Sequence, residues 1–252
     1  MACPPGRPIA TLPVKQTSSQ VQIKVASYNI HKGVGLDRRR DPERIVAVLR
    51  EIDADVIALQ EADRRFGDRA SVLPRGLIDD HSPWCVVHLR SRPDSMGWHG
   101  NALLVRRGIE VLLAEPVRLP TLEPRGAICA ELMVAGARIR VAGMHLDLSG
   151  LRRRHQLRAV LDHVASNGDT CPTVMMGDFN QWSHIRGAMR EFGPDWQTIV
   201  PGNSFPSRQP VAALDRIVLS HHWTALETGV HHSALSARAS DHLPVFARIS
   251  HA

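Results

Sequence analysis

Short apolar runs recur along the chain and predict β-strands. The first, at 21–30, alternates apolar and polar positions and then ends in polar residues. The Ala135-Gly136 step is a tight-turn signal, so the runs on either side of it should form a hairpin. Further runs predict strands at 55–59, 102–105, 110–113, 127–134, 138–144, 173–176, 214–219 and 245–249.

Two segments carry apolar residues at helical spacing. Asp41-Pro42 opens the first, because Asp can cap a helix and Pro suits its first turn. The second spans 151–164, with Leu157, Val160, Leu161 and Val164 predicted to face inward and Arg152, Arg153, Arg154 and Arg158 outward. Residues 64–98 are rich in Arg, Asp, Pro and Gly, which favours long surface loops.

Strand–helix units mixed with hairpins predict an α/β (α+β) fold, in which two mixed β-sheets pack face to face with helices outside. A chain of 252 residues suits one large domain, at 21–252, after a flexible arm at 1–20. The sequence shows no signal peptide and no apolar stretch long enough for a membrane span, so we expect a soluble, cytoplasmic monomer.

The charge balance narrows the partners only slightly. A formal charge of +6 attracts phosphate-bearing molecules, whether nucleic acid, an anionic membrane or phosphorylated metabolites, but a solvated basic surface explains it equally well. The arginine runs at 38–40 and 152–154 are expected to be solvated faces that could guide a polyanion. The four cysteines form no C-x-x-C pair, which favours reduced thiols and argues against structural zinc.

Polar residues able to bind metal or phosphate stand at the ends of several predicted strands. Singly, each is explained as a turn former or a helix cap. Together they predict a site where strand ends converge. The set is Asn29, Glu61, His145, Asp178, Asn180, Asp215, Asp241 and His242.

The residue types in this set suit phosphoester hydrolysis. Asn29, Glu61 and Asp241 offer the hard oxygen ligands that Mg²⁺ or Mn²⁺ prefers. Asp178 can orient or deprotonate a water, and Asn180 can donate to a phosphate oxygen. The histidines, His145 and His242, can place positive charge or a proton where the transition state gathers negative charge.

The motifs that hold these residues resemble the endonuclease/exonuclease/phosphatase superfamily. They are SYNIHKG at 27–33, DVIALQEAD at 55–63, GNALLVRR at 100–107, RGAICAEL at 125–132, MHLDLS at 144–149, MGDFNQW at 176–182, FPSRQPVAALDRIVLS at 205–220 and SDHLPV at 240–245. The resemblance runs from about residue 21 to the C-terminus, and its closest likeness is to small bacterial members. It implies a DNase I-like four-layer sandwich.

The resemblance also implies a role for each residue. Glu61 would be the principal metal ligand, assisted by Asn29 and Asp241. Asp178 would position the attacking water, and Asn180 would hold the scissile phosphate. Asp215 would orient His242, which would act as base or phosphate contact. His145 would stabilise the transition state or protonate the leaving oxygen, and the choice between Asp178 and His242 as general base stays open.

The substrate also stays open at this stage. A nuclease or other phosphodiesterase leads, with a lipid or sugar phosphodiesterase or phosphatase as the alternative and a non-catalytic phosphoester-binding module as the rival. Arg125 is a candidate contact to substrate phosphate, and His31 and Lys32 should border the site without doing chemistry. Adjacent histidines on a strand point to opposite faces, so the pairs 221–222 and 231–232 are not expected to chelate a metal.

Overall fold

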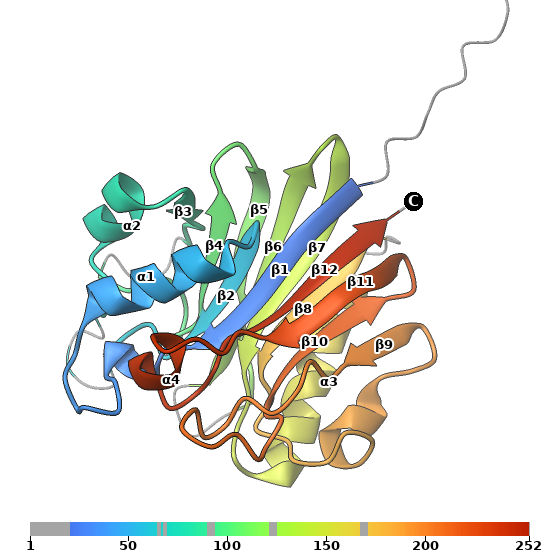
Figure 1. The fold of residues 1–252 in the computed structure, drawn as a ribbon. Helices are drawn as coiled ribbons and strands as arrows, with labels where there is room; N and C mark the ends of the chain where they lie inside the picture. Colours follow the sequence, from blue (N-terminus) through green and yellow to red (C-terminus); the bar gives the residue numbers. More distant parts are fainter. Residues whose placement is uncertain are drawn as a thin grey trace, which may run out of the picture.

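The structure is a computed structural model that describes residues 21–64, 67, 70–89, 94–120, 125–166 and 171–251. The predicted flexible arm at 1–20 lies outside the described residues. Figure 1 shows the elements in chain order, which are β1 (Val21–Asn29), η1 (His31–Gly33), α1 (Pro42–Ile52), β2 (Val56–Gln60), α2 (Arg75–His81), β3 (Trp84–Val86), β4 (Ala102–Arg106), β5 (Glu110–Val117), β6 (Gly126–Val134), β7 (Ala137–His145), α3 (Gly150–Ser166), β8 (Thr173–Asp178), η2 (Gly187–Glu191), β9 (Trp196–Ile199), β10 (Asp215–Ser220), β11 (Trp223–Val230), α4 (Ser236–Ala239) and β12 (Val245–His251).

The strands form two six-stranded mixed sheets. The first has the order β11-β12-β1-β2-β4-β3, and the second has the order β5-β6-β7-β8-β10-β9. Each contains one parallel pair, β1 with β2 and β7 with β8, which α1 and α3 respectively connect. Both sheets are thus built around a β-α-β unit with antiparallel strands added on either side.

Three apolar layers confirm the predicted four-layer sandwich. The first lies between the sheets and includes Ile23, Ile128 and Ile217. A second layer lies on the outer side of the first sheet, beneath α1 and α2, and a third packs α3 onto the second sheet. Figure 1 shows α1 and α3 on opposite sides of the paired sheets. Of the helices in the described residues, none is long and apolar enough to cross a membrane.

Local chemistry explains the first β-α-β unit. The Asp41 carboxylate accepts the Arg44 N–H at 3.0 Å and caps α1, and Pro42 occupies the first turn, as predicted. The helix ends at Asp53, which adopts the left-handed conformation. α1 therefore returns the chain to the sheet, so that Asn29 and Gln60 are opposite each other where β1 and β2 end.

In the second unit, a glycine allows β7 and β8 to approach closely. A Cβ atom on Gly177 would lie 1.9 Å from the Met144 carbonyl oxygen, so no side chain fits there. The next pair in the register is His145 with Asp178. Gly177 therefore sets the close pairing that brings these two polar residues together.

The described part of residues 64–98 is more ordered than the sequence suggested. They contain α2 and β3, and the indole of Trp84 is fully buried with its Nε1–H donating to the Ala54 carbonyl at 2.7 Å. The strands β9 and β11 were also missed, because they lie at sheet edges and alternate poorly between apolar and polar residues. Tertiary pairing determines these elements more than their own sequences do.

Arg153 corrects the prediction that the arginines of α3 face outward. Only 9% of it is exposed, and its guanidinium donates to the carbonyls of Asp147 and Leu148 and to Gln181 Oε1. The run at 152–154 is therefore not one solvated face. One of its members fastens the loop after β7 to the loop after β8.

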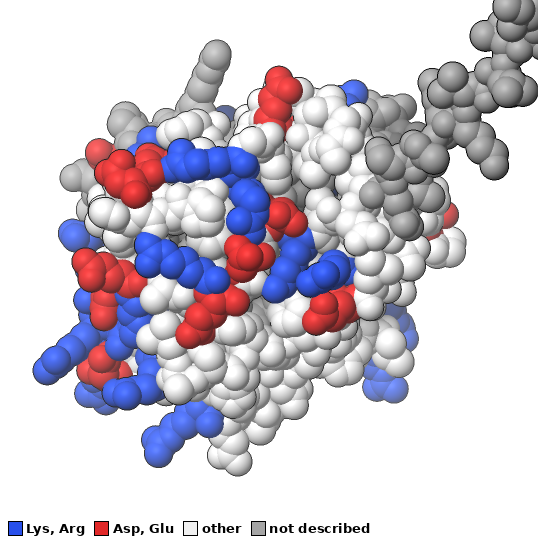
Figure 2. Space-filling view, turned by 45° about the horizontal axis from the view of Figure 1, so that its top comes forward, with Lys and Arg blue, Asp and Glu red and all other residues white. Residues whose placement is uncertain are grey.

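Charges of both signs lie side by side on the face of the molecule that Figure 2 shows. Partly exposed ion pairs also occur in the described part of the chain, where Arg106 bonds Asp53 at 2.6 Å and Asp55 at 2.9 Å. The positive formal charge of the chain is therefore not expressed on this face as a continuous basic patch.

Glu131 holds a buried ion-pair cluster in the β6–β7 hairpin. Its carboxylate accepts Arg140 Nη2 at 2.8 Å and Arg138 Nη2 at 2.6 Å, and Arg140 is 1% exposed. Burial alone would raise the pKa of Glu131, but the hydrogen bonds from the two arginines bring it below its ordinary value. The cluster therefore depends on Glu131 being ionised.

We predict that Glu131→Gln lowers the free energy of unfolding by about 2–4 kcal/mol, because it leaves the Arg140 charge buried without its carboxylate. Since the folded-state pKa is depressed, this stabilisation is present above the unfolded pKa and is lost as the pH falls through the folded one. Urea denaturation from pH 7 downward should show the wild type converging on the variant. Glu227→Gln, which breaks the exposed pair with Arg248, is the matched control and should change little. An equal effect of both substitutions would contradict the prediction.

Candidate active site

Three site residues stand in one row across the second sheet. His145 at the end of β7 pairs with Asp178 at the end of β8, and Asp178 pairs with Asp215 at the start of β10. Neighbours in register point to the same face of a sheet. The row is almost fully buried, with exposed fractions of 5% for His145, 1% for Asp178 and 0% for Asp215.

A hydrogen bond to Asp178 joins the two sheets at the site. Asn29, which ends β1 of the first sheet, donates its Nδ2–H to Asp178 Oδ2 at 3.1 Å. The same oxygen lies 3.3 Å from His145 Nε2 and 3.8 Å from His242 Nε2, and Oδ1 accepts the Asn180 backbone N–H at 2.9 Å. The structure thus brings together five of the residues that the sequence selected.

The surroundings keep Asp178 ionised. Burial alone would raise the pKa of this carboxyl, but the hydrogen bond from His145 and the positive charges of His242 and His145 hold the pKa far below its usual range. A buried anion that contacts histidines and an amide is well placed to orient a water molecule without being protonated itself.

Asp215 orients His242. His242 Nδ1 donates to Asp215 Oδ2 at 2.8 Å, and the same oxygen accepts the Ser204 hydroxyl at 2.6 Å. Burial opposes the charged imidazole, but Asp215, together with the nearby Asp178, raises the pKa of His242 to about 10. With Nδ1 committed to Asp215, His242 directs Nε2 toward Asp178.

Ser240 is a contributor that sequence reasoning missed. Its hydroxyl donates to the Asn29 carbonyl at 2.7 Å and accepts the His242 backbone N–H at 3.3 Å. It therefore ties the end of β1 to the loop that carries His242. Its place in SDHLPV, directly before Asp241 and His242, was the available signal.

Glu61 directly follows β2 and pairs with a positively charged side chain. Its carboxylate forms an ion pair with the ammonium of Lys32, which the sequence analysis expected only to border the site. Burial alone would raise the pKa of Glu61, but the charges of His145 and Lys32 and the Lys32 hydrogen bond lower it. The backbone φ of Glu61 is 56°, a left-handed conformation that is unusual for glutamate and common at functional sites.

The oxygen donors near Glu61 fit a hard divalent cation. The Glu61 carboxylate already attracts a positive charge, and Asn29 Oδ1 accepts only the His31 backbone N–H among the hydrogen bonds of the described residues. Asp241, whose side chain is 34% exposed, has Oδ1 3.8 Å from His31 Nδ1, and its carboxylate is accessible to a further ligand. Glu61, Asn29 and Asp241 therefore supply the oxygen chemistry that Mg²⁺ or Mn²⁺ requires.

A second group of ligand-type side chains competes with this assignment. Within the described part of the chain, one group of three or more has all its ligand atoms within 4.8 Å of one another: Asp178, Asp215 and His242. Asp215 Oδ2, however, already accepts two hydrogen bonds, and His242 has committed Nδ1 to it. The donors of this group are thus partly engaged with one another, whereas Glu61, Asn29 and Asp241 are oxygen donors of the type that hard cations prefer.

Asn180 and Arg125 complete the predicted set. Asn180 has a left-handed backbone with a φ of 50°, and its Nδ2 donates to the Leu146 carbonyl at 2.9 Å, which leaves the second amide hydrogen for a ligand. The Arg125 guanidinium contacts His145 Nε2. Arg125 thus places a permanent positive charge beside the row of site residues.

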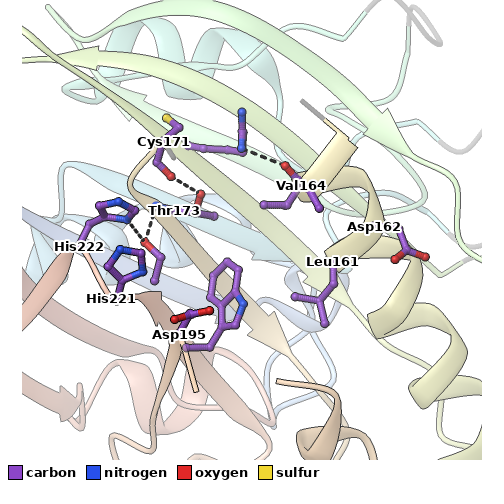
Figure 3. A pocket seen from close by; sticks show the side chains of 12 residues that line it. Leu161, Asp162, Val164, Cys171, Thr173, Asp195, His221 and His222 are labelled. Atoms are coloured by element: carbon purple, nitrogen blue, oxygen red, sulfur yellow. Dashed lines mark hydrogen bonds between the residues drawn. The ribbon is translucent and has the colours of Figure 1, made fainter. Parts of the chain in front are cut away.

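A separate cavity of about 410 Å³ lies where β8 starts and β10 ends, away from Asp178 (Figure 3). His221 and His222 line it with their rings stacked 3.9 Å apart, which corrects the prediction that they point to opposite faces. They occupy the turn after β10, where alternation no longer applies. Burial and the neighbouring His221 and His251 lower the pKa of His222.

With this geometry in place, comparison with known sequences identifies the class. The sequence profile of the Endonuclease/Exonuclease/phosphatase family matches residues 26–242. The chain belongs to this family, as its motifs predicted. The matched region includes every residue of the candidate site, from Asn29 to His242.

Individual relatives agree with the family and the fold. The chain is 28% identical to protein YbhP of Escherichia coli (strain K12), whose function is uncharacterized, over 92% of this chain and 98% of YbhP. A family protein from Bacteroides thetaiotaomicron shares the fold with a TM-score of 0.73 at 16% identity, covering 93% and 99% of the two chains. The human Nocturnin catalytic domain with bound sulfate matches at 0.70 and 19% identity over 92% and 95%, and TDP2 of D. rerio with a single-strand DNA product at 0.71 and 16% over 90% and 98%.

We predict that Asp215→Asn lowers the pKa of the His242 imidazole from about 10, because it removes the negative charge that stabilises the imidazolium. NMR titration of the histidine side chains in the metal-free protein measures this. His222, at the other end of β10, is an internal reference that should not move. A His242 pKa unchanged by the substitution would show that Asp215 does not control this ring.

Proposed function

We propose that the chain is a divalent-metal-dependent phosphoester hydrolase that cleaves phosphodiesters with an activated water. The observation that carries the proposal is the ionised, buried carboxylate of Asp178, which faces two histidines and an amide within 3.8 Å. A phosphodiester is anionic and repels hydroxide, so its hydrolysis needs an oriented water and several positive groups around the phosphate. Asp178 orients the water, and His145, His242 and Arg125 are the positive groups around the phosphate.

Each residue has one task in this proposal. Asp178 orients the water and accepts its hydrogen bond, and the free amide hydrogen of Asn180 donates to a phosphate oxygen. The raised pKa of His242 favours its charged form, in which it acts as a cation toward the phosphate. His145, beside Arg125, stabilises the transition state or protonates the leaving oxygen. The raised pKa of His242 favours a cationic role for this ring, and the lowered pKa of Asp178 favours orienting the water over taking its proton, so the choice of general base stays open.

The metal would lie at Glu61, with Asn29 and Asp241 as further ligands. When bound, Mg²⁺ or Mn²⁺ supplies charge neutralisation and lowers the pKa of coordinated water. Lys32 would leave the Glu61 carboxylate free for this cation by rotating away from it. The donors are all oxygen, which supports Mg²⁺ or Mn²⁺ over a softer metal.

The substrate class of the proposal is a phosphodiester, with a nuclease as the leading form and a lipid or sugar phosphodiesterase as the alternative. Neighbours of the same fold bind sulfate in Nocturnin and a single-strand DNA product in TDP2, which supports a tetrahedral anion as the common ligand. The expected domain at 21–252, the cytoplasmic location and the monomeric state stay predictions.

We predict that the purified protein hydrolyses bis-p-nitrophenyl phosphate with Mg²⁺ or Mn²⁺ and loses this activity in EDTA. Asp178→Asn and His242→Ala should each lower turnover at least ~100-fold, because each removes a group that acts on the water or the phosphate. Parallel assays on a phosphomonoester, DNA, RNA and a sphingomyelin vesicle determine the subclass.

The control for this assay is Asp162→Asn, which removes an exposed carboxylate of α3 away from the row and should leave turnover unchanged. Circular dichroism checks that the variants are folded. Turnover that persists in EDTA, or in Asp178→Asn, would refute the proposed mechanism.

A further inference from the structure

Large apolar side chains are exposed around the edge of the candidate site. Among the described residues, the four most exposed large apolar side chains are Ile185 at 78%, Leu148 at 67%, Leu151 at 66% and Trp182 at 65%. All four lie on the two segments that follow β7 and β8. Leu148 comes three residues after His145, and Trp182 comes two residues after Asn180. We call these four residues the apolar rim.

The two halves of the rim are joined by a buried contact. Arg153 donates to the Leu148 carbonyl at 2.6 Å and to Gln181 Oε1 at 3.2 Å. Gln181 is the residue before Trp182 and is 7% exposed. A single guanidinium thus holds the loop with Leu148 and Leu151 against the loop with Trp182 and Ile185. The rim side chains are therefore exposed on segments that a buried hydrogen-bonded contact holds in place.

Positive charge accompanies the rim. The segments 148–158 and 182–190 contain six arginines, of which Arg153 is buried and Arg154 and Arg158 pair with Glu191. Arg186 and Arg190 are exposed, and the side chain of Arg152 is 40% exposed. Arg186 and Arg190 therefore add positive charge to the aliphatic and indole side chains of the rim, while Arg152 lies 3.7 Å from the Asp147 carboxylate.

A further exposed apolar side chain is connected to His242 through Phe205. Val211 is 61% exposed, and its N–H donates to the carbonyl of Phe205 at 2.9 Å. The Phe205 ring packs against the imidazole of His242 with centroids 4.8 Å apart. An exposed apolar group therefore also lies on the segment that packs against His242.

We propose that the apolar rim docks the candidate site onto the surface of an anionic phospholipid membrane. Aliphatic side chains insert among acyl chains, Trp favours the headgroup boundary, and arginines pair with anionic headgroups. Single-stranded nucleic acid fits less well, because it needs aromatic rings for stacking and the rim offers one ring among three aliphatic side chains. This inference rests on the proposed phosphodiesterase function and adds the place where the substrate is found. The reacting phosphodiester would be that of a lipid headgroup or of a ligand held at the membrane.

The test is vesicle flotation in EDTA, which separates binding from catalysis. We expect the wild type to float with phosphatidylcholine–phosphatidylglycerol vesicles, and much less with phosphatidylcholine alone. The double variant Trp182→Ser/Ile185→Ser should weaken binding at least ~10-fold, since it removes two apolar groups that enter the bilayer. Arg186→Gln should weaken binding to the anionic vesicles only. The wild type should also show a blue shift of tryptophan emission on the vesicles, which the double variant lacks.

The matched control is Leu226→Ser, which removes a side chain that is 50% exposed on the edge strand β11. It should bind vesicles like the wild type. The proposal would be overturned if the wild type did not float with the anionic vesicles. It would also be overturned if Leu226→Ser lost as much vesicle binding as Trp182→Ser/Ile185→Ser. Binding of a single-stranded oligonucleotide that depends on Trp182, with vesicle binding unaffected, would overturn it in favour of a nucleic-acid surface. Turnover of the soluble diester tests the proposed hydrolase activity, and vesicle flotation tests membrane docking. A negative result in one assay therefore does not decide the other.

Discussion

The burial of one carboxylate, that of Asp178, is the constraint on which the rest of the site depends. An ionised group that is 1% exposed is stable only when donors and cations surround it. The first sheet provides Asn29, the second provides His145, and the loop before β12 provides His242. The two sheets are held together by a broad apolar layer, but at the ends of β1 and β8 they are joined by this polar contact.

This constraint propagates outward. His242 can remain charged in a buried place because Asp215 accepts its Nδ1–H, and Asp215 is itself bonded by Ser204. Asn29 is held by Ser240, which also bonds the backbone of His242. His242 and Asn29, two of the polar groups that face Asp178, are thus each held in place by a further residue, an arrangement that preorganises charge before a substrate arrives. The left-handed backbone of Glu61 shows that this edge of the first sheet also carries local strain.

Much of this architecture was readable from the sequence, because strand ends are marked by abrupt changes from apolar to polar residues. Asn29, Asp178 and Asp215 were found in this way, and the β6–β7 hairpin followed from Ala135-Gly136. What the sequence could not provide was register and partner choice. The position of Arg153 inside an arginine run hides its burial, and the contact of Lys32 with Glu61 joins residues 29 positions apart. Edge strands such as β11 depend on their neighbours, so their own residues signal them weakly.

We propose that Asp178, Asp215 and His242 act on the water and the phosphate while Glu61 binds the metal. The most direct measurement is the anomalous scattering of Mn²⁺ soaked into crystals of the protein. The account predicts a manganese peak coordinated by the Glu61 carboxylate, with Asn29 or Asp241 beside it and Lys32 displaced. A peak coordinated by Asp178, Asp215 and His242, with Glu61 still paired to Lys32, would contradict it.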